Sequence, residues 1–184
     1  MTRIMFLALL LTGITSITLS AQKYYTKSGQ ISFHSDTPIE KIEAHNHKAV
    51  SVLDAATGAM EFSVLIKGFQ FEKALMQEHF NENYMESNEF PKSIFKGKVT
   101  DLSGVDIDVD GEYPVNVIGE LTIHGVTQSV ETKGTMTVSG GALSASSSFE
   151  VAVADYGIEI PAVVADNIAK IVRIDVTLDY QVLN

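Results

Sequence analysis

The histidines of this chain are its first candidates for chemistry, because a neutral imidazole is a common metal ligand. His45 and His47 lie two residues apart in AHNHK, so on a strand they would share one face, as two ligands would. The other histidines are His34, His79 and His124. There is no cysteine and no HExxH motif, and no acid stands at a diagnostic spacing. We therefore predict no specific metal site, with His79 fixing a helical segment and His124 in a turn.

Three aspartates in DIDVDGEYPVNV resemble the first half of a calcium-binding loop. Asp106, Asp108 and Asp110 precede Gly111 with the right spacing, but the twelfth position, normally Glu, is Val117. A hairpin turn at Asp110-Gly111 between two short strands explains the motif better, because glycine tolerates positive φ. Adventitious binding of calcium is the alternative.

Four glutamates are candidates for acid–base catalysis. Glu78, Glu82, Glu86 and Glu89 follow one another at spacings of three and four residues, so on a helix they would form an acidic stripe. Such stripes are more often solvated than catalytic. The sequence also has no GxSxG elbow and suggests no Ser–His–acid set. We predict that the protein is not an enzyme and has no cofactor; an enzyme acting on lipid substrates is the weaker alternative.

The elements that must position these side chains are mostly strands. Apolar and polar residues alternate from residue 172 to 182, as in a half-buried antiparallel strand. Similar patterns occur in QISFH, AMEFSVLIKG, VNVIGELTI and SSFEVAV, and X-Gly pairs such as His124-Gly125 suit the turns between strands. Roughly eight strands predict an antiparallel barrel or sandwich. The apolar face of the last strand consists of Val172, Ile174, Val176, Leu178, Tyr180 and Val182.

Residues 72 to 88 interrupt this pattern. Phe71, Leu75, Phe80 and Tyr84 follow a spacing close to a helical period, and Pro91 stops any helix. We predict one or two short helices whose apolar side is covered by the end or wall of the sheet.

The first 21 residues have the pattern of a secretory signal peptide. Arg3 precedes the apolar run IMFLALLLTGITSITL, and small residues suit cleavage near Ser20 or Ala21. The run is too short and wrongly flanked for a spanning helix. We therefore predict a periplasmic or secreted protein with one domain over residues 22–184 and no membrane span after cleavage.

The charge of the chain limits its partners. A formal net charge of −10 disfavours nucleic acid and anionic lipid headgroups. Whether two copies form a homodimer is left open by the sequence.

Several motifs together resemble the YceI-like family. Phe90-Pro91 ends the helical segment before the strand that contains Phe95, LTIHGVT spans residues 121–127, and Asp155-Tyr156-Gly157-Ile158 lies near the end of the chain. The resemblance covers nearly the whole mature chain. It implies a lipocalin-like, eight-stranded antiparallel barrel with a helical insertion, and binding of a long polyisoprenoid or isoprenoid quinone inside the barrel.

The inward-facing apolar rows would then form the ligand site. A tunnel with such a lining offers few hydrogen bonds but binds hydrocarbon, since each buried methylene contributes about 0.8 kcal/mol. Periodicity alone favours a filled core, and with it a structural or interaction module; the resemblance favours an apolar-ligand carrier. The predicted ligand-binding residues are Phe62, Val64, Phe80, Met85, Phe95, Leu121, Ile123, Phe149, Val151, Ile174, Val176 and Leu178.

Overall fold

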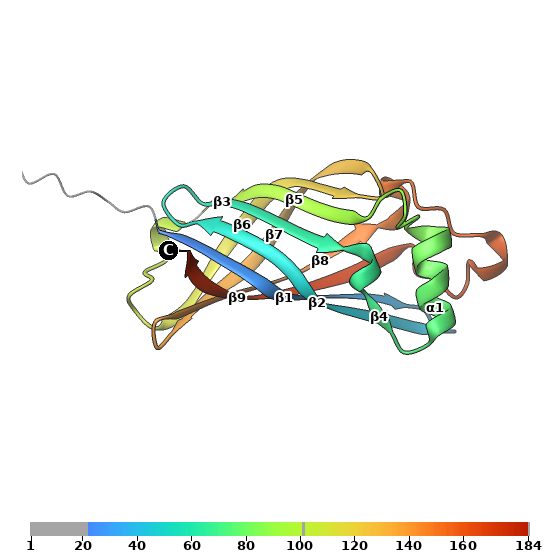
Figure 1. Ribbon diagram of the computed structural model, residues 1–184, viewed down its shortest axis with the longest axis horizontal. Helices are drawn as coiled ribbons and strands as arrows, with labels where there is room; N and C mark the ends of the chain where they lie inside the picture. Colours follow the sequence, from blue (N-terminus) through green and yellow to red (C-terminus); the bar gives the residue numbers. More distant parts are fainter. Residues whose placement is uncertain (1–21, 101, 184) are drawn as a thin grey trace, which may run out of the picture.

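The strands of this chain form one sheet that closes into a barrel (Figure 1). The computed structural model describes residues 22–100 and 102–183, so the predicted signal peptide lies outside the described residues. The strands are β1 (Lys23–Asp36), β2 (Lys41–Asp54), β3 (Ala59–Leu65), β4 (Gln70–Phe71), β5 (Lys92–Val99), β6 (Gly111–Ile123), β7 (Val126–Ser139), β8 (Ala142–Ala152) and β9 (Ile171–Leu183).

Pairing between the first two strands closes the barrel. The sheet order is β1-β9-β8-β7-β6-β5-β3-β2, every neighbouring pair is antiparallel, and β1 also pairs with β2. The short strand β4 adds to the outer part of β2, where Phe71 pairs with Ala44. The predicted eight-stranded antiparallel barrel is therefore confirmed, with one extra strand.

Alternation of side chains explains which face of each strand is buried. In β9, Ile174, Leu178 and Tyr180 are buried, whereas Arg173 and Asp179 are exposed. The expectation for Val182 is wrong: its side chain is 42% exposed, because the row leaves the core at the end of the strand.

The turns follow the predicted chemistry at one position and not at another. His124 and Gly125 join β6 to β7, and both have positive φ, 50° and 74°. The predicted hairpin turn at Asp110-Gly111 is wrong. Gly111 is the first residue of β6, and the preceding residues form a long loop with the 3-10 turn η3 (Leu102–Gly104). Leu102, Val105 and Ile107 of this loop are half-buried against the core, so hydrophobic packing rather than strand pairing orders it.

The predicted helical segment lies between β4 and β5. It consists of α1 (Ala74–His79) and a π-helical turn η2 (Phe80–Tyr84), and the 3-10 turn η1 (Ile66–Gly68) precedes β4. Near the C-terminus come two more 3-10 turns, η4 (Val153–Tyr156) and η5 (Ala162–Val164). In the part of the chain that the structure describes, no helix has the length and apolar character needed to cross a bilayer.

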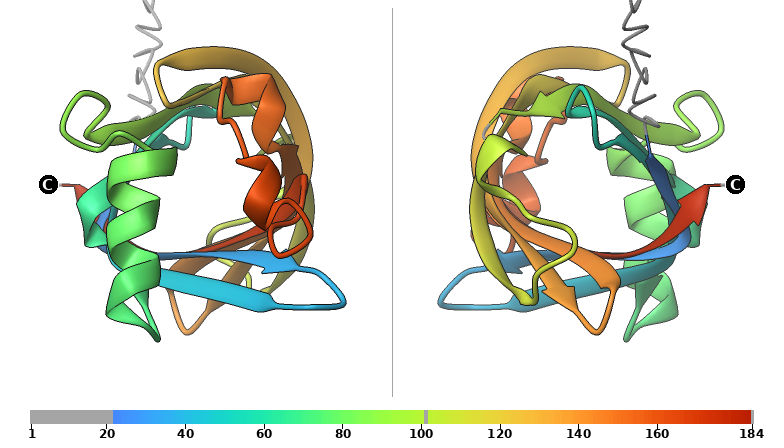
Figure 2. Two further views of the ribbon diagram at one scale, coloured as in Figure 1. Left: turned by 90° about the vertical axis from the view of Figure 1, so that its right-hand side faces the viewer. Right: turned by 90° about the vertical axis from the view of Figure 1, so that its left-hand side faces the viewer.

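The two ends of the barrel differ. At one end, which we call the mouth, α1 lies on one side and the segment with η4 and η5 lies across from it (Figure 2). At the other end, which we call the deep end, the loop between β5 and β6 packs on the core. Strand β5 runs from the mouth at Lys92 to the deep end at Val99, which fixes the depth of its residues.

Candidate ligand-binding cavity

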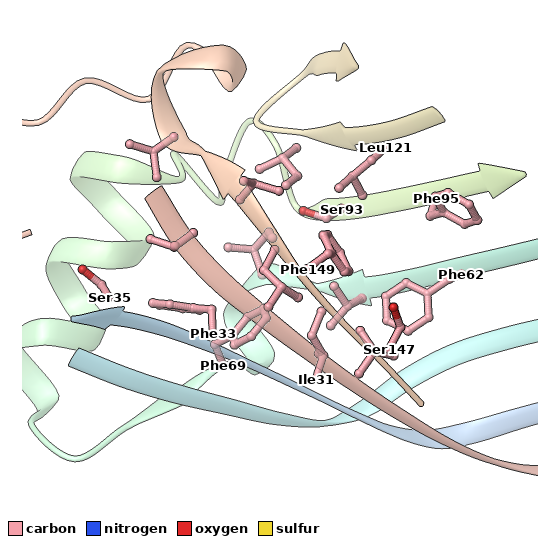
Figure 3. A pocket seen from close by; sticks show the side chains of 18 of the residues that line it. Ile31, Phe33, Ser35, Phe62, Phe69, Ser93, Phe95, Leu121, Ser147 and Phe149 are labelled. Atoms are coloured by element: carbon pink, nitrogen blue, oxygen red, sulfur yellow. The ribbon is translucent and has the colours of Figure 1, made fainter. Parts of the chain in front are cut away.

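The barrel interior is hollow. A cavity of about 580 Å³ extends from the mouth toward the deep end, and its walls are almost entirely aliphatic and aromatic (Figure 3). Its lining includes Lys73, Leu75 and His79, which are exposed at the mouth, and Leu53 and Tyr180, which are buried toward the deep end. Such a volume lies within the range of small-molecule sites in proteins.

All of the residues predicted to bind a ligand lie on the wall of this cavity. Ten come from strands that alternate in and out, and two come from the helical segment and the residue after it. Their contact with a ligand stays a prediction. The residues are Phe62, Val64, Phe80, Met85, Phe95, Leu121, Ile123, Phe149, Val151, Ile174, Val176 and Leu178.

Four stacked and tilted phenylalanine rings form an aromatic cluster just inside the mouth. Phe33 packs on Phe69, Phe71 and Phe80 with ring centroids 5.3–5.7 Å apart, and Phe71 lies 5.0 Å from Phe80. Sequence reasoning included Phe80 alone among the site residues. The spacing of two between Phe69 and Phe71 was a usable signal, because it places both rings on one side of an extended segment.

The deep end carries a buried hydroxyl pair. The Tyr180 and Ser51 hydroxyls are 2.9 Å apart, and Ser51 donates to the carbonyl of Glu61 at 3.1 Å. The Tyr180 phenol also donates to the sulfur of Met60 at 3.7 Å. Burial raises the pKa of Tyr180 to about 12, although the bond to Ser51 acts in the opposite direction. This end of the cavity therefore presents a neutral phenol whose proton is already donated.

The acidic and basic side chains of the lining, Glu40, Lys73 and His79, lie at the mouth instead. Glu40, in the turn between β1 and β2, accepts a hydrogen bond from Asn167 at 3.2 Å and lies 3.7 Å from the ammonium of Lys73. Ser35 accepts a hydrogen bond from the backbone of Ala169 at 2.8 Å. Glu40 thus connects three separate segments that line the mouth.

His124 is more than a turn residue. Its Nε2 lies 2.8 Å from Glu86, its Nδ1 lies 3.3 Å from the carbonyl oxygen of Tyr156, and its ring packs on Phe90. His79, by contrast, is exposed on the cavity rim. His124, rather than His79, makes these contacts to the end of the helical segment.

The other histidines and aspartates considered for chemistry contact neighbouring side chains or backbone groups. The rings of His45 and His47 stack, and His34 lies between Glu43 and Asp175. The carboxylate of Asp110 accepts a hydrogen bond from Gly140, and that of Asp106 from Asp108. Within residues 22–100 and 102–183, no three His, Asp or Glu side chains gather as metal ligands.

The four glutamates of the predicted acidic stripe differ in their environments. Glu78, Glu82 and Glu89 are exposed, and Glu86 pairs with His124. The structure therefore places no two of these carboxylates together in the cavity.

Known structures share this barrel at low sequence identity. A polyisoprenoid binding domain from Saccharophagus degradans, implicated in plant cell wall breakdown, is 14% identical with a TM-score of 0.75, covering 89% of this chain and 99% of that chain. Burkholderia cenocepacia BcnA is 15% identical, with a TM-score of 0.69 over 83% of this chain and 96% of that one. The YCEI protein of Campylobacter jejuni is 13% identical, with a TM-score of 0.51 over 100% and 91% of the two chains.

The comparison with protein-family models is more direct. No curated protein sequence matches the chain. The model of the YceI-like domain matches residues 15–180, which is nearly the full length and includes every strand up to most of β9. The hollow barrel, the helical segment at its mouth and this match agree, and the chain belongs to the YceI-like family.

Proposed function

We propose that this protein is an exported carrier or sequestering protein that binds a long apolar molecule, a polyisoprenoid or an isoprenoid quinone, inside its barrel. The observation that carries the proposal is the cavity of about 580 Å³ with its apolar wall. A filled core, the basis of the alternative interaction module, does not fit a cavity of this size. The similarity to a polyisoprenoid binding domain supports the same class of ligand.

The energetics favour a hydrocarbon chain over a polar molecule. Each methylene that leaves water contributes about 0.8 kcal/mol, and a chain as long as the barrel buries many of them. A polar molecule would lose hydrogen bonds to water that Phe62, Leu121 or Ile174 cannot replace. Binding, rather than turnover, is the function we propose, because nearly all of the cavity wall is apolar and Glu40, Lys73 and His79 of its lining lie at the rim.

The charged and amide side chains at the mouth also favour one orientation of the ligand. Lys73, His79 and Asn167 at the mouth can donate hydrogen bonds to a polar end group. At the deep end the Tyr180 hydroxyl already has partners in Ser51 and Met60. The tail therefore enters first, and a quinone ring or hydroxyl stays at the mouth.

Lipid extraction tests this proposal. Purified protein is extracted with organic solvent for mass spectrometry, and lipid-free protein is titrated with an isoprenoid quinone. We expect a prenyl lipid in the extract and saturable uptake of the quinone. Ala145→Phe, which places a ring in the deep part of the lumen, should weaken uptake of a long-chain quinone, whereas Asp179→Phe on the exposed face of β9 should not. An empty extract together with no quinone uptake would overturn the proposal.

Export is tested separately. The predicted cleavage site gives a mature chain that begins at Ala21 or Gln22. N-terminal sequencing of protein recovered from the periplasm or the medium should find one of these residues. Full-length protein confined to the cytoplasm would exclude export and leave the binding proposal standing.

A further inference from the structure

We propose that Phe95 determines how far the tail of the ligand enters the barrel, because two glycines allow its ring to rest against the wall. This inference rests on the proposed function and deepens it. Phe95 is 8% exposed, lies in the middle of β5 and pairs with Phe62 and Leu121 on the neighbouring strands. Figure 3 shows it far along the cavity from Ser35 and Phe33 at the mouth.

The ring of Phe95 occupies the space that two side chains would otherwise fill. Gly97 and Gly119 pair across β5 and β6, and both belong to the inward-facing rows of their strands. A Cβ added at Gly97 would lie 2.5 Å from the Cζ of Phe95, and one added at Gly119 would lie 2.7 Å from it. The carbonyl oxygens of Ile118 and Lys96 would lie 2.2 and 2.5 Å from the same two Cβ atoms. Atoms cannot approach so closely, so only glycine at both positions leaves the strands in place and gives the ring room against the wall.

The space kept open by this arrangement leads to a deep chamber. Its lining comes from the strand ends nearest the deep end. These residues are Leu53, Met60, Val99, Val115, Val117, Met136 and Tyr180. On β7 and β8 the lining also includes three small residues, Gly134, Ala145 and Ser147. A short chain is housed between the mouth and Phe95, whereas a long one must pass the ring.

A series of prenyl alcohols of increasing length tests the inference. Farnesol, geranylgeraniol and solanesol are titrated into lipid-free protein, and the longest alcohol retained is recorded. In Phe95→Trp the larger indole has no more room beside the glycines, because the carbonyl oxygen of Ile118 bounds that space at 2.2 Å from a Cβ at Gly97. We expect this variant to lose the longest alcohol that the wild type retains and to keep farnesol.

A matched substitution separates an effect on the length of the bound alcohol from a general weakening of binding. Phe33→Trp makes the same change in the aromatic cluster near the mouth, which chains of every length must pass. We expect it to weaken all alcohols in similar proportion. A Phe95→Trp profile parallel to that of Phe33→Trp or of the wild type would overturn the inference.

A measurement on the wild type does not depend on any variant folding. A long prenyl alcohol with a diazirine at its tail end is bound and irradiated, and labelled peptides are identified by mass spectrometry. We expect labels in the deep chamber, at residues such as Met60, Val99 or Met136. Labels confined to the region of Phe33 and Phe80 would overturn the inference and leave the proposed function intact. If the wild type binds no prenyl alcohol of any length and no isoprenoid quinone, the proposed function fails and the inference with it.

Discussion

At the residue scale, the phenol of Tyr180 links the cavity to the stability of the barrel. An unfolded tyrosine titrates near pH 10. Burial raises the pKa of Tyr180 to about 12 in the native state, so between these pH values the unfolded chain has lost a proton that the folded chain retains. The free energy of unfolding should therefore fall from pH 10 to pH 12, by on the order of 2 kcal/mol from this group.

Denaturant unfolding at several pH values measures this effect. The pKa values of Tyr24, Tyr84 and Tyr156 are also raised by burial, so the wild type alone cannot isolate Tyr180. Tyr180→Phe should reduce the loss of stability above pH 10, and Tyr25→Phe, on an exposed part of β1, should not. Equal slopes in the wild type and Tyr180→Phe would contradict the expectation.

Val176 tests the assignment of the inner face of β9. It lines the cavity and pairs with Ile31 and Ser147. Val176→Asp should lower the free energy of unfolding at pH 7 by about 3 kcal/mol, because the carboxylate would face an apolar wall without a partner. Thr177→Asp, one residue further on the exposed face, is the matched control and should change it little. Unchanged thermal stability of Val176→Asp would mean that this face is not buried.

Some properties of single residues could be read from the sequence and others could not. Period-two alternation correctly placed Phe62, Phe95 and Leu178 inside. It could not show that the ring of Phe95 rests over Gly97 and Gly119, because that contact depends on the register between β5 and β6. Register is a property of the assembled sheet.

At the element scale, two residues with positive φ contact each other through their side chains. Glu86 and His124 are the non-glycine residues with positive φ among those described, and their side chains lie 2.8 Å apart. Such conformations cost energy and persist when surrounding contacts fix them. The contact therefore holds the end of the helical segment against the turn between β6 and β7.

Removing this contact should loosen the helical segment more than the barrel. His124→Asn keeps a residue that tolerates positive φ but removes the reach to Glu86 and the Tyr156 carbonyl. We expect faster amide hydrogen exchange in residues 74–84 and a loss of about 2 kcal/mol in stability. His47→Ala, on the exposed face of β2, is the control. Faster exchange spread evenly over the strands would contradict a local role.

The elements themselves were largely predictable. Alternation predicted β1, β3, β6, β8 and β9, and the helical spacing predicted the segment at residues 72–88. No alternating pattern was identified for β2 or β7, although each has 14 residues. The loop before β6 was misread because Asp-Gly pairs favour hairpins in general, whereas here Val105 and Ile107 find a place on the core and make a longer loop stable. Strand β4 has two residues, too few for any periodic signal.

At the scale of the whole molecule, ligand binding should raise the melting temperature. A ligand that binds the folded barrel alone adds about 2.7 kcal/mol of stability at a concentration of about 100 times Kd. For a chain of this size we expect a rise of roughly 5–10 °C with geranylgeraniol, measured by differential scanning calorimetry. Ala145→Phe should show a smaller rise, since its ring takes space in the deep part of the lumen. A rise of the same size in that variant would indicate binding elsewhere.

Whether the barrel is hollow could not be predicted from periodicity. Filled and hollow barrels have the same inward-facing rows, and the difference depends on the summed volume of those side chains against the barrel radius. Here Gly97 and Gly119 let the ring of Phe95 lie against the wall, and Gly134 and Ala145 line the lumen without large side chains. The resemblance to a family, rather than the pattern of residues, favoured the hollow form.

The contacts of Glu40 at the mouth have a kinetic consequence. Glu40 joins the β1–β2 turn to Lys73 and Asn167, and the ammonium–carboxylate part of this linkage is exposed to the solvent. Dissolved ions screen such attractions. The segments joined by Glu40 at the mouth should therefore separate more often as ionic strength increases. Loading and unloading would then accelerate together, and the fraction of occupied barrels at equilibrium would stay the same.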